Sequence, residues 1–220
     1  MEFRLVYAGP LKAVTGGPGG RRVQEKHVIR KVLHKQLKRL WETVPLLKLR
    51  SAEHSVLNPG SHTRFLGNER HQLPSADFRV SLLETLGTQF DRCGYKFVPL
   101  VSNHLSLSCG LDILFLRRDM PGIPLITSGG DIDNRLKVLL DALRVPSLNC
   151  DELGGAVKEG DEDPYFFCLL EDDKLITELS ITTDFLLSPH SVGSETDVQL
   201  ILKVKIKPTD FTFENVAFVT

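Results

Sequence analysis

The segment from His27 to Val44 constrains the fold more than any other part of this sequence. Apolar residues recur in it at helical spacing and form one stripe, and Pro45 ends the run because proline cannot continue a helix. A helix of this kind must pack its stripe against another element. The expected members of the stripe are Val28, Ile29, Val32, Leu33, Leu37, Leu40, Trp41 and Val44.

Strand patterns and further helices surround this segment. The start, Met1–Pro10, alternates apolar and polar residues, and Gly110 predicts a bulge or bend in a later extended run. The order of elements predicts an α+β fold, with a mixed β-sheet covered by helices, in a single domain over residues 1–220. We expect a loop over 51–75 and an insertion over 145–164. Further strands are expected over 95–101, 104–118, 165–170, 174–185 and 198–207, and helices over 78–92 and 131–144.

The compartment is predicted from what the sequence lacks. No stretch approaches the roughly 20 apolar residues that span a bilayer, and the first ten residues do not resemble a signal peptide. The four cysteines show no Cys-x-x-Cys spacing, so we expect free thiols. We therefore expect a cytoplasmic protein that does not enter a membrane.

Charge is distributed unevenly along the chain. Between Arg21 and Arg50 there are ten basic residues against two acids, whereas Asp151–Thr220 holds fifteen acids against five lysines. Such a split favours a polyanionic partner at the basic end, although the net charge of −1 is unusual for a DNA-binding protein. The residues expected to contact DNA phosphates are Arg30, Lys31, Lys35, Lys38 and Arg39.

The stretch from Asp131 to Asp141 carries the clearest chemical pattern. Asp133, Lys137 and Asp141 are spaced four apart and share one face of the predicted helix. Two carboxylates two residues apart, with one more from Asp172 or Asp173, could hold Mg²⁺, which prefers oxygen ligands. Lys137 could then neutralise charge on a phosphate, and Asn134 could brace a ligand.

A purely structural interpretation of the same acids stays open. Asp131 or Asp133 could cap the helix, and Lys137 could bridge to Asp133 or Asp141. The acids of Glu171–Asp173 could form a hairpin turn.

Taken together, these residues resemble the signature of the RusA family of Holliday junction resolvases. The matching pattern is Asp131, Asp133, Asn134 and Lys137, then Asp141-Ala142-Leu143, and later Asp172-Asp173. The clear part of the resemblance covers about residues 111–185, and the chain is longer than typical members. The resemblance implies a RusA-like fold and a homodimer that cuts branched DNA symmetrically.

The resemblance also implies a cofactor and a set of site residues. It implies Mg²⁺, or alternatively Mn²⁺, held by Asp131, Asp133 and Asp173, with Asp172 as the other acid of the pair. It implies a catalytic role for Lys137, and we expect Asn134 and Asp141 to support the site from behind.

Two classes of function are therefore expected. One is a magnesium-dependent endonuclease for Holliday junctions or related branched DNA, and the other is a non-catalytic DNA-binding or assembly protein on the same fold. Catalysis requires the acids to converge, whereas binding alone requires only the basic helix.

Overall fold

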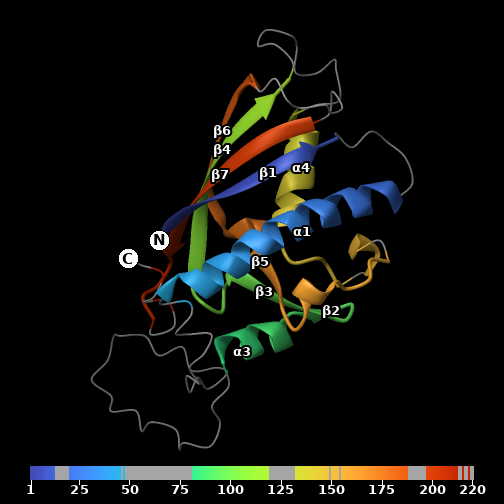
Figure 1. Ribbon diagram of the computed structural model, residues 1–220. Coiled ribbons are helices and arrows are strands. Elements are labelled where there is room, and N and C mark those ends of the chain that lie inside the picture. The colour runs from blue at the N-terminus through green and yellow to red at the C-terminus, as the bar shows by residue number, and fades with distance from the viewer. Residues whose placement is uncertain are drawn as a thin grey trace, which may run out of the picture.

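The structure is a computed structural model that describes residues 1–12, 20–45, 47, 81–118, 132–148, 150–153, 155–187, 197–212, 215 and 218 (Figure 1). The predicted loop over 51–75 lies outside these residues. The helices are α1 (Gly20–Thr43), α3 (Leu82–Gln89) and α4 (Ile132–Leu143). The strands are β1 (Glu2–Pro10), β2 (Asp91–Arg92), β3 (Tyr95–Val101), β4 (Leu107–Arg117), β5 (Phe166–Leu170), β6 (Ile176–Phe185) and β7 (Asp197–Pro208). Short 3₁₀ turns are η1 (Cys150–Leu153), η2 (Gly160–Glu162) and η3 (Asp173–Leu175).

The larger sheet has the order β1-β7-β4-β6. Strands β1, β7 and β4 pair antiparallel, whereas β6 joins β4 in parallel, so the predicted mixed sheet is confirmed. The register of β4 against β6 shifts between Cys109 and Gly110, which confirms the irregularity expected at Gly110. Residues along β1 and β7 alternate between buried and more exposed positions, as strands covered on one face do.

A smaller sheet, in the order β2-β3-β5, lies on the other side of α1. Nearly all of β3 and all of β5 are buried, and these two strands pair in parallel. One hydrophobic core cluster joins residues from both sheets and from α1, α3 and α4. The structure therefore confirms the α+β class.

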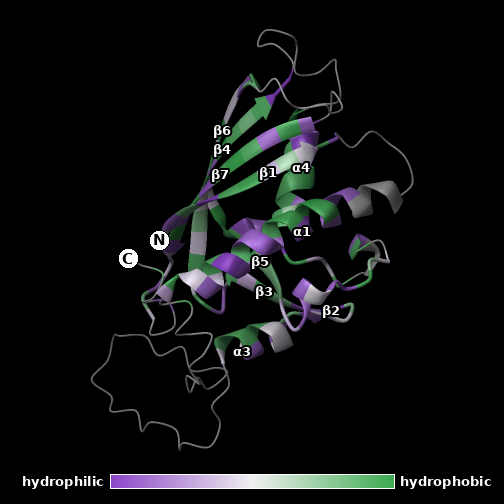
Figure 2. Ribbon diagram, viewed as in Figure 1, coloured by the Kyte–Doolittle hydropathy of each residue, from purple (hydrophilic) through white to green (hydrophobic). Residues whose placement is uncertain are grey.

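Helix α1 buries a different set of residues from the predicted stripe. Ile29, Leu33, Leu37 and Trp41 are buried as expected, but Val28 is 53% exposed and Val32 is 37% exposed. The buried side instead includes His27, Arg30 and His34. Figure 2 shows hydrophilic and hydrophobic residues mixed along the helix. The helix is turned relative to the prediction because it faces two sheets, and the second contact uses polar and aromatic side chains.

His34 connects α1 to two distant segments through its ring. The Phe167 amide of β5 donates to Nδ1 at 2.8 Å, and Nε2 lies 3.0 Å from the Asp161 carbonyl oxygen. Because Nδ1 accepts, the neutral ring carries its proton on Nε2 and donates it to Asp161. Burial lowers the pKa of His34, consistent with a neutral ring.

The cysteines depart in part from the expectation of free thiols. Cys109 and Cys168 are free and buried, and burial raises the pKa of each thiol to about 12. Cys93, however, is disulfide-bonded. The absence of Cys-x-x-Cys spacing excluded a local pair but could not exclude a bond between distant segments.

Among the described residues, no helix is long and apolar enough to cross a bilayer.

The buried histidines of α1 predict that acid destabilises the fold. Burial lowers the pKa of His27 to about 4, below the ordinary value of 6.5, and neither ring nitrogen has a hydrogen-bond partner. Below pH 6.5 His27 therefore binds a proton in the unfolded chain, whereas in the folded chain its ring stays neutral until the pH approaches 4. This contribution to stability is complete above pH 6.5 and is lost as the pH falls toward 4. For His27 we expect a loss on the order of 2 kcal/mol between about pH 7 and about pH 5.

The measurement is urea denaturation of wild type and of His27→Leu at both pH values. The variant should lose about 2 kcal/mol less than wild type over this interval. An equal pH dependence in the two proteins would contradict the assignment of His27 as the titrating group.

Candidate functional site

Asp133 and Lys137 lie on the exposed side of the first two turns of α4. Asp133 Oδ1 accepts a hydrogen bond of 2.8 Å from the Asn134 amide. A carboxylate in this first turn is stabilised by the free amides and the helix dipole. Asp131, the other acid of the motif, lies outside the described residues. The buried side of α4 is formed by Arg135, Val138, Leu139, Ala142 and Leu143.

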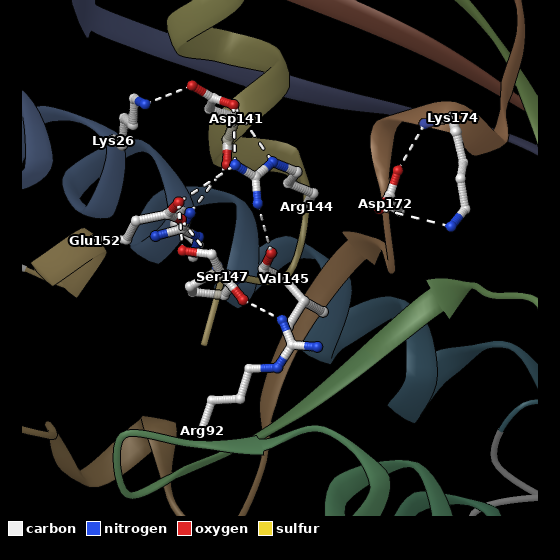
Figure 3. Close-up of polar contacts among 11 residues, drawn as sticks. Lys26, Arg92, Asp141, Arg144, Val145, Ser147, Glu152, Asp172 and Lys174 are labelled. Atoms are coloured by element: carbon white, nitrogen blue, oxygen red, sulfur yellow. Dashed lines mark hydrogen bonds and ion pairs between the residues drawn. The ribbon is translucent and has the colours of Figure 1, made fainter. Parts of the chain in front are cut away.

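Asp141 lies near the other end of α4 and belongs to a different group of charges. Its carboxylate pairs with Lys26 of α1 and, at 3.3 Å, with Arg144. Its backbone carbonyl accepts a 2.9 Å hydrogen bond from Arg30. These contacts, shown in part in Figure 3, fix α1 against α4. They give Asp141 a structural role in holding the helix of the motif.

The Glu171–Asp173 segment forms the turn into β6. Asp172 caps η3, where its Oδ1 accepts a 3.0 Å hydrogen bond from the Lys174 amide. This hydrogen bond is the largest influence that lowers the pKa of Asp172. Glu171 accepts hydrogen bonds of 2.7 and 2.9 Å from the backbone and side-chain amides of Asn103. Asp173 itself is exposed.

The turn that holds Asp172 lies at the C-terminal end of α4. Arg144, directly after the helix, forms a β-bridge with Leu170, which precedes Asp172 by two residues. Arg144 also contributes to the lowered pKa of Asp172. Asp133 is ten residues before Leu143, which corresponds to about 15 Å along the helix axis.

Asp133 and the Asp172–Asp173 pair are thus at opposite ends of α4 in one chain. The convergence expected between them is not observed in the described part of the chain. Within that part, the only group of three acids or histidines close enough to share an ion is Glu159, Asp161 and Glu162. Motif spacing could not reveal this, because it does not report the direction in which α4 crosses the sheet.

The group Glu159, Asp161 and Glu162 faces the basic helix. Lys31 Nζ lies 2.7 Å from Glu159 and 3.2 Å from Glu162, whose side chain is 1% exposed. Lys35 pairs with Asp161 at 3.5 Å, and Lys38 donates to the Asp161 carbonyl at 2.9 Å. The predicted insertion over 145–164 therefore contains the acidic partners of Lys31 and Lys35.

These contacts correct the expectation that the basic residues of α1 form an open DNA-binding surface. Arg30 is 1% exposed, so its guanidinium does not reach the surface in this structure. Lys31 is 22% exposed and already has two acidic partners. Lys35 and Arg39 remain exposed. The sequence could not show this because partners separated by more than 120 residues leave no local pattern.

The C-terminal end of α4 gathers cations that sequence reasoning missed. Arg144 donates to the Val145 carbonyl at 3.2 Å, and Arg92 donates to the Pro146 carbonyl. Glu152 bonds Arg144 at 3.3 Å. Burial raises the pKa of Glu152, but hydrogen bonds from Ser147 and the nearby arginines outweigh it and lower the pKa overall. Cations at a helix C-terminus are stabilised by the dipole and the free carbonyls.

Comparison with protein-family models found no matching family. Comparisons with curated protein sequences and with solved structures found no significant match either.

The pairing of Lys31 with a buried acid predicts a stability effect that a solvated lysine would not show. Lys31→Gln should lower the free energy of unfolding by about 1–3 kcal/mol, because it leaves the Glu162 carboxylate buried without its cation. Lys35→Gln is the matched control. Its side chain is 62% exposed, so we expect a change below about 0.5 kcal/mol.

Urea denaturation near neutral pH measures both variants. Equal, small effects would mean that the acidic segment does not depend on Lys31.

Proposed function

We propose that this chain is a magnesium-dependent endonuclease that cuts branched DNA as a homodimer, in the manner of the RusA-family resolvases its motif resembles. The observation that carries the proposal is the exposed pair Asp133 and Lys137 on the first two turns of α4. The pair lies at the end of a helix that packs behind a mixed sheet with its other end fastened by Asp141.

The residues at this end of α4 fit a divalent cation with oxygen ligands. Asp133 uses Oδ1 for the Asn134 amide, and its side chain is exposed, so the carboxylate is accessible to an ion. Mg²⁺ keeps several waters and needs only one or two carboxylates. Asp133 and Asp131 would hold it. When bound, the ion would supply charge neutralisation for the phosphate and activation of a water molecule.

Lys137 and Asn134 have separate roles in the proposed site. Lys137 is exposed one helical turn after Asp133, where its ammonium would stabilise charge on a phosphate held at the same face. Asn134 donates its backbone amide to Asp133 and so orients the carboxylate. Asp172 and Asp173 lie at the other end of α4 in this chain, so the proposal rests on the first turns of the helix.

A non-catalytic role on branched DNA is the second candidate. It is favoured by the distance between Asp133 and the Asp172–Asp173 turn, because a site with fewer converging carboxylates binds a metal ion more weakly. A wild-type protein that binds a four-way junction but leaves it intact in both Mg²⁺ and Mn²⁺ would support this candidate.

The test of the nuclease proposal is the substitution Asp133→Asn. It should abolish cleavage of a labelled four-way junction in Mg²⁺, a loss of at least about 100-fold, while junction binding stays equal or becomes tighter. The reason is that the amide removes a metal ligand and a charge that repels phosphate at the same time. Gel assays of cleavage and of binding without metal give both readouts.

Asp91→Asn is the matched control, since Asp91 is an exposed acid on β2 outside the motif. It should cleave at the wild-type rate. If Asp133→Asn folds normally but loses both binding and cleavage, Asp133 contributes to binding and the proposed division of roles is wrong.

A further inference from the structure

We propose that the uncovered face of the larger sheet is the surface through which two copies of this chain pair. The inference rests on the homodimer of the proposed function and names its interface. Helices α1 and α4 lie on one side of this sheet, which we call the inner face, and the described residues leave the opposite outer face to solvent (Figure 1).

A row of apolar residues crosses the centre of the outer face. Val6 of β1 pairs in register with Ile201 of β7, and Ile201 pairs with Leu114 of β4. Val6 is 41% exposed, and the other two are partly exposed in the middle of the sheet. Their neighbours in the sequence point inward to the core, so these three side chains lie on the outer face, outside the hydrophobic core cluster. A continuous apolar row on an uncovered sheet face is typical of a surface that packs on a second sheet.

Charged residues divide the outer face into two halves of opposite sign. The β1 and β7 half carries Arg4, Lys203, Lys205 and Lys207 against Glu2 and Asp197, a net charge of +2. The β4 and β6 half carries only acids, with a net charge of −3. These acids are Asp112, Glu178 and Asp184.

A two-fold axis can bring the basic half of one copy against the acidic half of the other. If the axis runs along the strands between β7 and β4, the basic half of one copy lies over the acidic half of the other. Lys203 then faces Asp112 of the partner subunit, because the two residues are cross-strand neighbours on either side of that axis. Ile201 faces Leu114 of the partner subunit for the same reason. An axis across the strands at the apolar row would instead lay the basic half of one copy over the basic half of the other, and the acidic half over the acidic half.

The dimensions of the sheet allow such an interface. Four strands about 4.8 Å apart, each with about eight residues, give a face of roughly 19 by 25 Å. The flat area is on the order of 500 Å², which reaches the smaller end of specific interfaces. Pairing through the β1 edge is disfavoured, because Gln36 already bonds the amide and carbonyl of Val6 at 2.9 and 2.6 Å.

Paired charge reversals test the proposal. Lys203→Glu alone and Asp112→Lys alone each place like charges at two symmetric positions of the interface, so each variant should dimerise at least about tenfold more weakly than wild type. An equimolar mixture should regain a dimer, because the heterodimer restores both opposite-charge contacts between subunits. The contacts within each chain are the same before and after mixing. Light scattering at micromolar concentration, with circular dichroism to verify folding, gives the readout.

Arg39→Glu, an equal change of charge on α1, is the control and should leave the dimer unchanged. Leu114→Lys provides a variant that does not depend on the charge pairs, and it should also weaken the dimer. A monomeric wild type, or a mixture that fails to regain the dimer, would overturn the proposal. Junction cleavage by wild type in Mg²⁺ is measured separately, so a failure of the nuclease proposal is distinguishable from a failure of this interface.

Discussion

The fold depends on a helix that buries cationic and polar side chains between two sheets. Arg30 is almost completely buried, and burial lowers the pKa of its guanidinium. A buried charge is tolerated only where opposite charges or carbonyls surround it. The Asp141 carbonyl accepts from Arg30, while the carboxylates of Asp141 and Glu152 counter its charge. One buried arginine therefore connects α1 to the end of α4, the helix that carries the motif.

The same requirement explains much of the charge asymmetry of the chain. The excess of cations near residues 21–50 and the excess of acids after 151 favour an external polyanion when each is considered alone. In the structure, Lys31 and Lys35 meet Glu159, Asp161 and Glu162 of the same chain. Part of the basic surface is thus neutralised internally. Among the described residues, a DNA ligand could still contact exposed cations such as Arg39 on α1 and Lys137 at the first turns of α4.

Local patterns predicted the elements well and their contacts poorly. Alternation located β1 and β7 to within two residues, and the α+β class followed from the order of elements. For α1, the apolar pattern predicted the buried aliphatic residues but missed His27 and Arg30. Hydropathy treats these two residues as surface residues, although both are buried. For the site, the sequence identified Asp133 and Lys137 as neighbours on one face. It could not show that Asp141 bonds Lys26, because that contact spans 115 residues.

The direction of α4 decides which acids can act together. Strands β4 and β6 are parallel neighbours, and α4 follows β4 and ends beside the turn that begins β6. The helix therefore returns antiparallel to both strands, with its first turn near their carboxyl ends (Figure 1). Beyond the carboxyl ends of a parallel strand pair, a helix N-terminus offers free backbone amides to an anion. Asp133 and Lys137 are at that end, whereas Asp172 caps a turn at the amino end of β6. A phosphate and its metal ion at this position would therefore lie near the positive end of the α4 dipole and within reach of Asp133 and Lys137. The proposed chemistry is accordingly assigned to the start of the helix.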